Sequence, residues 1–414
     1  MKSTLKKNKG SVVEGEITLT TDEFKPHWEA IYGAALSRVQ VPGFRAGSAP
    51  RELAMKHVDT DAVFHEAANR AVRESLSHVT EENDWKIIDG PSVEVLEASP
   101  LEKASDAKPG FRYKARFVVF PEVKLGNYKK IAHKIFKEQK AVVVSPEEIE
   151  QSIEWLRGSR AEMTKVDRPA AKGDVVEADV ESFLDNEPIP GGKLVHDRFL
   201  LGESRFVPGF DDMLVGSAIG ARLDFSLTAP ADYWNESLRG REIRFAVILH
   251  AVFERKLPEL NDAFAASLGS EIKTIEGLKK NIREGLEHEK QDREQDRIRA
   301  KMIEAIATDS EIDVPDVMLE RTLEALVEET AELTKQDAGA PDKTKLREAL
   351  REKAVSRVKG YLVMHAIAEE AALTPTEEEV REEMARRGVD QKDGYDYSYG
   401  ILRNKKVFEF LEKQ

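Results

Sequence analysis

The sequence VPGFRAGSAP, at residues 41–50, is the most informative stretch of the chain. It sets an aromatic residue, Phe44, beside a cation, Arg45, in a segment whose glycines and prolines favour turns. Both residues lie outside the apolar pattern of the flanking segments, so the stretch predicts a loop that presents Phe44 and Arg45 to solvent. The alternative that the residues leave open is a turn between helices whose Phe44 packs back into the core.

Helices are expected on both sides of this loop. Apolar residues recur at helical spacing before it, over residues 24–39, and again after it, over residues 63–72. Pro42 and Gly43 would end the first helix. Pro50 suits the first turn of the next helix, where a missing N–H costs little.

Strands are expected around these helices. Apolar and polar residues alternate at residues 13–19 and 111–117, which is typical of half-buried strands, and Val93 and Val95 fit a strand between them. Strands and helices together predict a compact α+β domain over residues 1–124, with the loop as its tip.

The next segments change in character. Residues 125–156 are interpreted as a linker and a bridging helix, because Ser145-Pro146-Glu147-Glu148 forms a capping box with proline at the first helical position. Residues 157–254 are dense in β-formers and turn residues, which predicts a β-rich domain.

Residues 255–414 carry helical patterns, with start signals at residues 314–315 and 374–377. One apolar stripe at residues 275–286 lapses and resumes at residues 298–306, so this helix is expected to project into solvent midway. Packing of helices on one another is the first interpretation of such stripes, and a surface that binds other polypeptides is the second. The chain is thus predicted to be multidomain α+β.

The composition indicates a cytoplasmic protein without a membrane segment. Charged residues make up 34% of the chain, and no apolar run is long enough to cross a bilayer. The start, MKSTLKK, lacks the apolar stretch of a signal peptide. The absence of cysteine excludes disulfides and thiol chemistry. A net charge of -14 argues against a protein that coats DNA, although residues 1–56 hold nine Lys and Arg against six Asp and Glu.

The string GFR at residues 43–45, followed by Gly47 and Pro50, resembles the ribosome-docking signature of the trigger factor family. The resemblance extends in order through nearly all 414 residues. It implies docking on the large ribosomal subunit near the exit tunnel through Gly43, Phe44, Arg45, Ala46, Gly47 and Pro50. The family usually has lysine where this chain has Ala46, so docking is expected to be weaker or more tolerant of salt.

The resemblance also implies how the helical domain is used. In the family, helical arms protrude from a C-terminal body and form a cradle for nascent and unfolded polypeptides. Many weak apolar contacts would keep affinity modest and allow release without a nucleotide, which agrees with the lack of a phosphate-binding glycine motif. A homodimer away from the ribosome is a further state that the sequence leaves open.

The segment Arg205–Phe210 is similar to the floor of the proline pocket in FKBP-type peptidyl-prolyl isomerases. The pocket residues implied for catalysis are Phe206, Val207, Phe210, Tyr233 and Phe245. Isomerisation of an X-Pro bond needs no nucleophile, acid or base, because a dry apolar pocket lowers a barrier of roughly 20 kcal/mol that comes from amide resonance. The alternative is that these residues only pack the core of the barrel.

Several positions depart from the FKBP pattern. A gapless alignment over Asp174–Phe210 puts Val180 where an aromatic residue usually stands and Ile189-Pro190 where Phe-Asp is usual, and Asp197 replaces a further aromatic residue. We therefore expect a domain that binds peptide with little isomerase activity.

Two functions stay open at this point. The first is an ATP-independent ribosome-associated chaperone, and the alternative is an FKBP-type isomerase that acts on unfolded proteins independently of the ribosome. The docking loop favours the first, and the altered pocket weakens the second. No cofactor or metal is expected, because the nine histidines are scattered and His57 with His65 is a poor ligand pair at helical spacing.

Overall fold

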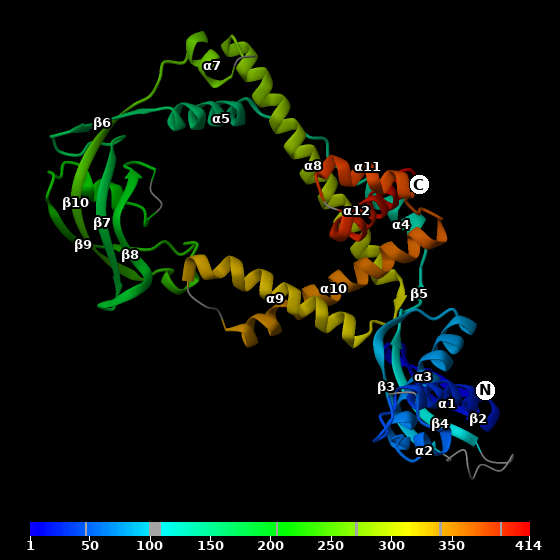
Figure 1. Cartoon of the computed structure of the whole chain (residues 1–414). Coiled ribbons are helices and arrows are strands. Elements are labelled where there is room, and N and C mark those ends of the chain that lie inside the picture. The colour runs from blue at the N-terminus through cyan, green and yellow to red at the C-terminus, as the bar shows by residue number, and fades with distance from the viewer. Residues whose placement is uncertain (46–47, 99–108, 204–205, 270–271, 339–341, 390) are drawn as a thin grey trace. The chain divides into compact units, whose positions relative to one another are not determined.

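A computed structural model describes residues 1–45, 48–98, 109–203, 206–269, 272–338, 342–389 and 391–414 (Figure 1). The chain divides into two compact units. The first unit comprises Met1–Glu138, Arg299–Glu328 and Lys343–Gln414, and the second comprises Gln139–Ile298 and Glu329–Asp342. Each unit is described by itself below.

The first unit contains a four-stranded antiparallel sheet in the order β1-β2-β4-β3. Its strands are β1 (Lys2–Asn8), β2 (Val12–Thr20), β3 (Ile87–Ala98) and β4 (Pro109–Val119). Ile17 pairs with Tyr113 in the β2–β4 register, and both side chains are fully buried. The three predicted strands are confirmed. Strand β1 was not predicted, because its lysine-rich sequence lacks an apolar alternation and suits an edge strand.

Helices α1 (Thr21–Arg38) and α3 (Thr60–Glu82) pack against this sheet, and the short α2 (Arg51–Met55) lies between them in sequence. Helix α1 begins with a capping box, in which Thr20 Oγ1 accepts the N–H of Glu23 and the Glu23 carboxylate accepts the N–H of Thr20. Both helices seal an aromatic core against β4.

The segment after the loop differs from the prediction of one continuing helical pattern. Helix α2 ends at Met55, and α3 begins anew after Asp59, whose carboxylate accepts the N–H groups of Asp61 and Ala62. Aspartate is a preferred N-cap residue, because its carboxylate accepts N–H groups of the first helical turn. A proline side chain cannot accept them, so the second helix begins at Asp59.

The second unit contains a five-stranded antiparallel sheet in the order β6-β10-β7-β8, with β9 also paired to β10. Its strands are β6 (Glu162–Val166), β7 (Val175–Leu184), β8 (Glu187–Leu200), β9 (Arg222–Thr228) and β10 (Glu242–Lys256), and α6 (Phe210–Leu214) follows β8. Val176, Ala178 and Val180 of β7 are fully buried, which defines the inner face. The predicted β-rich character of this part of the chain is confirmed, whereas β6, with mostly exposed residues, gives no strand signal of its own.

Three helical segments of the second unit share a small apolar cluster. They are α5 (Pro146–Ser159), α7 (Asp262–Leu268) and the first part of α8 (Ile275–Asp309). Phe264 and Leu278 are the large buried residues of this cluster, and Leu156 packs against them. The capping box predicted at Ser145 is confirmed, since its side chain accepts the N–H of Glu148 and the Glu148 carboxylate accepts the N–H of Ser145.

The middle of α8 is mostly exposed, as expected, and polar contacts connect it to the segment before α5. The Glu294 carboxylate accepts the N–H of Lys140 over 2.7 Å, and Lys290 Nζ donates to the carbonyl of Val143 over 2.9 Å and pairs with Glu148. Hydrogen bonds from Arg297 and from the N–H of Lys140 lower the pKa of Glu294 to about 2. The exposed middle of the helix is confirmed, whereas these polar contacts were not predicted, because they leave no apolar stripe in the sequence.

The remaining helices are α4 (Tyr128–Phe136), α9 (Asp316–Ala338), α10 (Lys343–Glu370), α11 (Glu377–Arg387) and α12 (Gln391–Leu411), with a short β5 (Val123–Lys124) paired to β11 (Glu311–Ile312). Leu323 of α9 and Ala354 of α10 are fully buried in one cluster. The stripes of these helices therefore pack against each other, as the first interpretation held. No helix in the described ranges is long and apolar enough to cross a membrane.

Candidate functional site

The loop at residues 41–50 leaves α1 through a tight turn. Val41 is buried, and its carbonyl accepts the N–H of Phe44 over 3.0 Å. Pro42 and Gly43 take the two central positions of this turn. Gly43 has a φ of 88°, the positive value that a type II turn requires at this position and that glycine adopts without strain. The turn directs the chain outward just before Phe44.

The structure exposes the aromatic side chain of this loop. Phe44 is 44% exposed, and Arg45 is exposed beside it. The carbonyl of Arg45 accepts the N–H of Ser48 over 2.9 Å. Ala46 and Gly47 lie outside the described residues. The alternative in which Phe44 packs into the core is therefore wrong, and the loop presents an apolar group and a cation together.

Pro50 lies just before α2 and not within its first turn. Its carbonyl accepts the N–H groups of Leu53 and Ala54 over 2.9 and 3.0 Å. Leu53 and Met55 of this short helix are exposed as well. Sequence reasoning missed these two side chains, because a helix of 5 residues is too short to show a stripe.

A cavity of about 290 Å³ lies at the inner face of the five-stranded sheet. Its described lining residues are Ser182, Ile189, Pro190, Gly191, Gly192, Leu194, Phe206, Val207, Tyr233, Trp234, Asn235, Leu238, Ile243 and Phe245. Four of the five predicted pocket residues are among them: Phe206, Val207, Tyr233 and Phe245. Tyr233 is the only ionisable side chain in this set of described lining residues, so the cavity suits an uncharged apolar group such as a proline ring.

The fifth predicted residue, Phe210, supports the cavity from behind. It is fully buried and stacks on Phe206 with ring centroids 4.2 Å apart. It also meets Phe245 at 5.0 Å with the two rings nearly perpendicular. Phe210 therefore holds two lining aromatics in place and is not itself among the described lining residues.

The loop after β9 brings two aromatic residues to the cavity. The Tyr233 N–H donates to the carbonyl of Pro230 over 3.1 Å, and Arg239 Nε donates to the Tyr233 carbonyl over 2.7 Å. Trp234 follows, is 74% exposed and lines the cavity. Sequence reasoning missed Trp234, although an aromatic residue next to Tyr233 in a turn-rich loop was an available signal.

The positions that depart from the FKBP pattern fall in different places. Ile189 and Pro190 line the cavity, so they form an apolar but non-aromatic side of it. Val180 is fully buried in the core, and Asp197 pairs with Ala178 in the β7–β8 register. Neither Val180 nor Asp197 is among the described lining residues.

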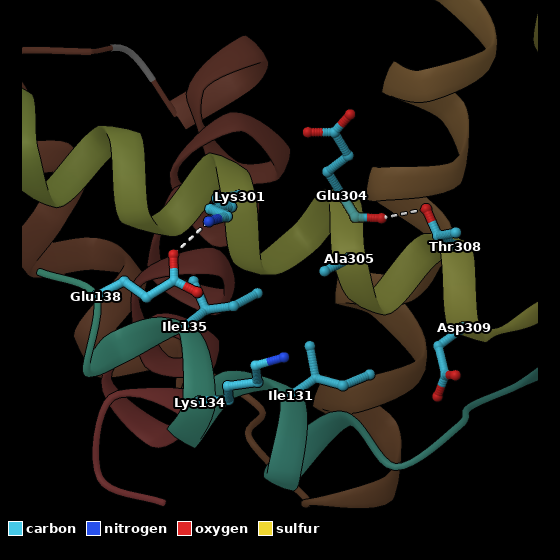
Figure 2. Close-up of a pocket in the computed structure, with 9 residues that line it drawn as sticks. All are labelled: Ile131, Lys134, Ile135, Glu138, Lys301, Glu304, Ala305, Thr308 and Asp309. Atoms are coloured by element: carbon cyan, nitrogen blue, oxygen red, sulfur yellow. Dashed lines mark hydrogen bonds and ion pairs between the residues drawn. The ribbon is translucent and has the colours of Figure 1, made fainter.

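A second cavity, of about 630 Å³, lies in the first unit between α4 and the last part of α8 (Figure 2). Ile131 and Ile135 of α4 and Ala305 of α8 give it an apolar floor. Figure 2 shows Lys301 reaching across to Glu138, with which it forms an ion pair. The remaining lining residues are Lys134, Glu304, Thr308 and Asp309, so the floor has a charged rim. The arrangement can contact apolar and charged groups together.

Exposed large apolar side chains are pronounced in the second unit. Val143, Trp155, Trp234 and Leu333 are 72%, 72%, 74% and 70% exposed. Trp155 belongs to the helix that begins at the capping box, yet it points away from the apolar cluster of that helix. These side chains provide apolar contact area for another polypeptide.

Comparisons with known protein families cover nearly the whole chain. Residues 1–156 match the family described as bacterial trigger factor protein (TF), and residues 274–413 match its C-terminus. Residues 166–256 match FKBP-type peptidyl-prolyl cis-trans isomerase. The α+β N-terminal part, the β-rich middle part and the helical C-terminal part described above correspond to these three matches.

Two curated relatives agree with these family matches. Trigger factor of Caldicellulosiruptor bescii is 32% identical over 381 residues, which cover 90% of this chain and 84% of the relative. Trigger factor of Halalkalibacterium halodurans is 30% identical over 425 residues and 96% of both chains. A solved structure of the trigger factor chaperone, 21% identical, covers 100% of both chains with a TM-score of 0.49.

Proposed function

Because the chain belongs to the trigger factor family, with an FKBP-type domain between its N-terminal and C-terminal parts, we propose that it docks on the ribosome near the exit tunnel and shelters nascent polypeptides. The observation that carries the docking proposal is the exposed Phe44 beside Arg45 on the loop. An aromatic side chain can anchor in an apolar crevice, and a guanidinium pairs with phosphate or carboxylate. With ribosome docking as the premise, the protein is proposed to act in the cytoplasm.

We place the domain limits as the sequence predicted them. Residues 1–124 would dock, residues 125–156 would connect, residues 157–254 would bind proline-containing segments, and residues 255–414 would bind clients. The docking positions are Gly43, Phe44, Arg45, Ala46, Gly47 and Pro50. Association of free chains into a homodimer stays a prediction, which sedimentation equilibrium of the free protein checks.

Co-sedimentation with ribosomes tests docking. The double variant Phe44→Ala, Arg45→Ala is expected to lose most binding, whereas Phe136→Ala, Lys137→Ala is expected to bind like the wild type. Phe136 and Lys137 are a matched control, since they are also an exposed aromatic–cation pair in the first unit. Ala46→Lys is expected to strengthen binding at low salt, because it restores a cation. Equal binding by both double variants contradicts docking through the loop.

The same experiment separates the alternative function. An FKBP-type isomerase acting independently of the ribosome is favoured by the aromatic cavity and should be indifferent to the loop. If the loop variants leave ribosome binding unchanged and the protein accelerates X-Pro isomerisation strongly, the alternative replaces the chaperone proposal.

The FKBP-type domain is proposed to bind proline-containing segments while turning them over slowly. The apolar walls and the aromatic floor support binding, and the non-aromatic side at Ile189 and Pro190 supports slow turnover. A protease-coupled assay on a short Xaa-Pro peptide measures turnover, and the fluorescence of Trp234 reports binding, with Trp234→Phe as the control. A rate within about tenfold of an efficient FKBP contradicts slow turnover.

Client binding by residues 255–414 is proposed to be supported by exposed apolar side chains of the second unit, three of which lie before that range. Many weak contacts of this kind let a client bind and leave without a nucleotide. Replacing Val143, Trp155, Trp234 and Leu333 by serine is expected to weaken suppression of aggregation severalfold while ribosome binding persists. Val93→Ser, Val95→Ser, on exposed positions of β3, serves as the control. Undiminished suppression by the fourfold variant contradicts this assignment.

A further inference from the structure

Three potential metal ligands meet on the outer face of the five-stranded sheet. Asp179 of β7, His196 of β8 and His250 of β10 each offer one ligand atom, and these atoms lie within 4.8 Å of one another. Asp179 Oδ2 is 2.9 Å from His250 Nε2, and the two imidazole rings stack with centroids 4.4 Å apart. Within the described part of the chain, this is the one group of its kind.

The cluster lies opposite the aromatic cavity. Ala178 and Val180 on either side of Asp179 are fully buried, so the alternation of β7 turns Asp179 outward. On β10, Leu249 before His250 is also fully buried. The three ligands are therefore separate from the proline pocket and belong to no function proposed above.

Two β-bulges create the grouping. On β10, Leu249 pairs with Ala178 and Ala251 pairs with Glu177, so His250 is an extra residue with no partner position on β7. On the other side of β7, the register shifts between Ala178 and Val180, opposite the segment that contains His196. Bulges redirect side chains and are frequent beside functional sites.

The backbone at His196 is strained, as is common at functional sites. Its φ is 51°, a left-handed conformation that costs a residue with a side chain about 1 kcal/mol or more. Asp179 Oδ1 accepts the N–H of His196 over 2.8 Å, which holds this conformation in place. One carboxylate thus fixes the first histidine through its backbone and contacts the second through its side chain.

A second carboxylate orients the ring of His196. Glu177 Oε1 lies 3.1 Å from His196 Nδ1, and Glu177 Oε2 accepts a hydrogen bond from Arg198 over 2.7 Å. A histidine that binds a metal ion through one ring nitrogen usually donates the N–H of the other ring nitrogen to a carboxylate. Coordination by His196 would then use Nε2.

We propose that Asp179, His196 and His250 form a binding site for a divalent transition metal, with Zn²⁺ as the best fit. Imidazole nitrogens favour Zn²⁺ and related ions over Mg²⁺ or Ca²⁺, which prefer oxygen ligands. Two histidines and one carboxylate are a known three-ligand set for zinc, with a fourth position left for water or another ligand. Sequence analysis predicted no metal site, because the three residues are far apart in the chain.

The observed spacing permits this coordination with small movements. Ligand atoms about 2.1 Å from a tetrahedral zinc lie about 3.4 Å apart. The contacts here run from 2.9 Å between Asp179 and His250 to at most 4.8 Å, so ligand-atom movements of up to about 1.5 Å bring the atoms to coordination distance. The His196 side chain is 61% exposed, which leaves an entry path for the ion.

The competing explanation is an ion pair that only stabilises the bulges. It accounts for the contact between Asp179 and His250, but it assigns no purpose to the stacked second ring or to the orientation of His196 by Glu177. The two explanations differ in whether the wild-type chain binds a metal ion more tightly than a simple His–carboxylate pair does.

Titration calorimetry of the full, untagged chain with Zn²⁺ tests the proposal. The protein is first dialysed against a chelator, and the wild type is expected to bind one ion per chain. His250→Gln and Asp179→Asn are each expected to weaken binding at least about tenfold, and Glu177→Gln by about tenfold through the outer shell. Co²⁺ in place of Zn²⁺ should give the visible absorption of a tetrahedral site, and Mg²⁺ should not compete.

His288→Gln is the matched control. His288 Nδ1 lies 2.9 Å from Asp292 on α8, so it belongs to an exposed two-residue pair of the same unit without a third ligand. This variant is expected to bind Zn²⁺ like the wild type. Near-ultraviolet circular dichroism of each variant verifies that the fold persists. Zn²⁺ binding that is equal in the wild type and in His250→Gln, or that is lost only in His288→Gln, overturns the proposal.

Discussion

The N-terminal sheet and the FKBP-type sheet both enclose phenylalanine clusters, but they relate these clusters to their candidate sites in opposite ways. In the first, Phe24 and Phe111 stack 5.1 Å apart in a sealed core, and Phe44 lies outside it on a loop. In the second, Phe206 lines a cavity while Phe210, stacked on it, is fully buried.

The difference shows when packing and function can be separated. A docking residue on a loop makes few contacts within its own fold, so its loss should change binding and spare stability. A pocket formed by the core itself uses each aromatic side chain for packing and for the ligand. Substitutions in the FKBP-type pocket should therefore change both properties together.

The largest effect is expected from Phe210→Ala. Truncating a buried phenylalanine costs about 3–5 kcal/mol, because it leaves a void beside Phe206 and Phe245. Denaturant unfolding followed by circular dichroism measures this loss, and the same variant should bind Xaa-Pro peptide poorly. Phe210→Leu, which retains most of the volume, is the control. Normal peptide binding by a destabilised Phe210→Ala would separate packing from function and break the comparison.

The loop variant Phe44→Ala, Arg45→Ala is expected to show the reverse. Central hot-spot residues contribute about 2 kcal/mol or more to binding, which corresponds to more than tenfold in ribosome affinity. Thermal unfolding should stay within about 0.5 kcal/mol of the wild type, since both side chains are exposed. A large drop in Tm without a change in ribosome binding would show that the loop is structural.

The loss of stability of the FKBP-type domain at low pH is expected to depend on Asp174. Burial raises its pKa, but hydrogen bonds from Arg168 at 2.6 and 3.0 Å and from the N–H of Ala171 outweigh burial and lower it. A lowered pKa contributes stability that is present above the unfolded value of about 3.9 and is lost as pH falls through the folded value.

Asp174→Asn should therefore cost about 1–3 kcal/mol at neutral pH and flatten the stability curve below about pH 4. Urea unfolding at several pH values measures both effects. Asp224→Asn, at a more exposed partner of Arg244 in the same sheet, is the control. If the free energy of unfolding of Asp174→Asn falls at low pH as steeply as that of the wild type, the role of Asp174 is contradicted.

The loss of stability of the N-terminal domain at high pH is expected to depend on Tyr113. Burial raises the pKa of Tyr113 to about 12, although its hydroxyl lies 2.6 Å from Ser75 Oγ. A raised pKa contributes stability below the unfolded value of about 10, and this is lost as pH rises from about 10 to about 12. Tyr113→Phe should cost about 1 kcal/mol at neutral pH and remove this loss. Tyr32→Phe on α1 is the control. If Tyr113→Phe loses stability at high pH as steeply as the wild type does, the prediction is contradicted.

Local signals predicted much of the fold. The capping box at Ser145 and the start signal at residues 374–377 each mark a helix start that the structure confirms, because a cap involves residues only three positions apart. The alternation at residues 13–19 and 111–117 likewise yields β2 and β4. Strands β1 and β6 were missed, since their exposed, charged residues carry no alternation and only pairing with a neighbour makes them strands.

The candidate sites also combine features that nearby residues encode with features that only the folded chain brings together. The turn at Pro42 and Gly43 was visible in the sequence, because a proline followed by a glycine favours one turn type. The place of Phe210 behind the cavity and of Trp234 beside it was not visible, since both depend on which side chains the closed sheet brings together.

The sequence by itself determined the family, the order of the α+β, β-rich and helical parts, and the loop that carries Phe44, because these rest on motifs and on spacing within a few residues. Only the tertiary structure decided that Phe44 is exposed, that four predicted residues line one cavity, and that Asp179, His196 and His250 meet. The last grouping depends on bulges in the pairing of separate strands. A bulge adds one residue to one strand of a pair, and the sequence around it does not show which residues of a distant strand it will face.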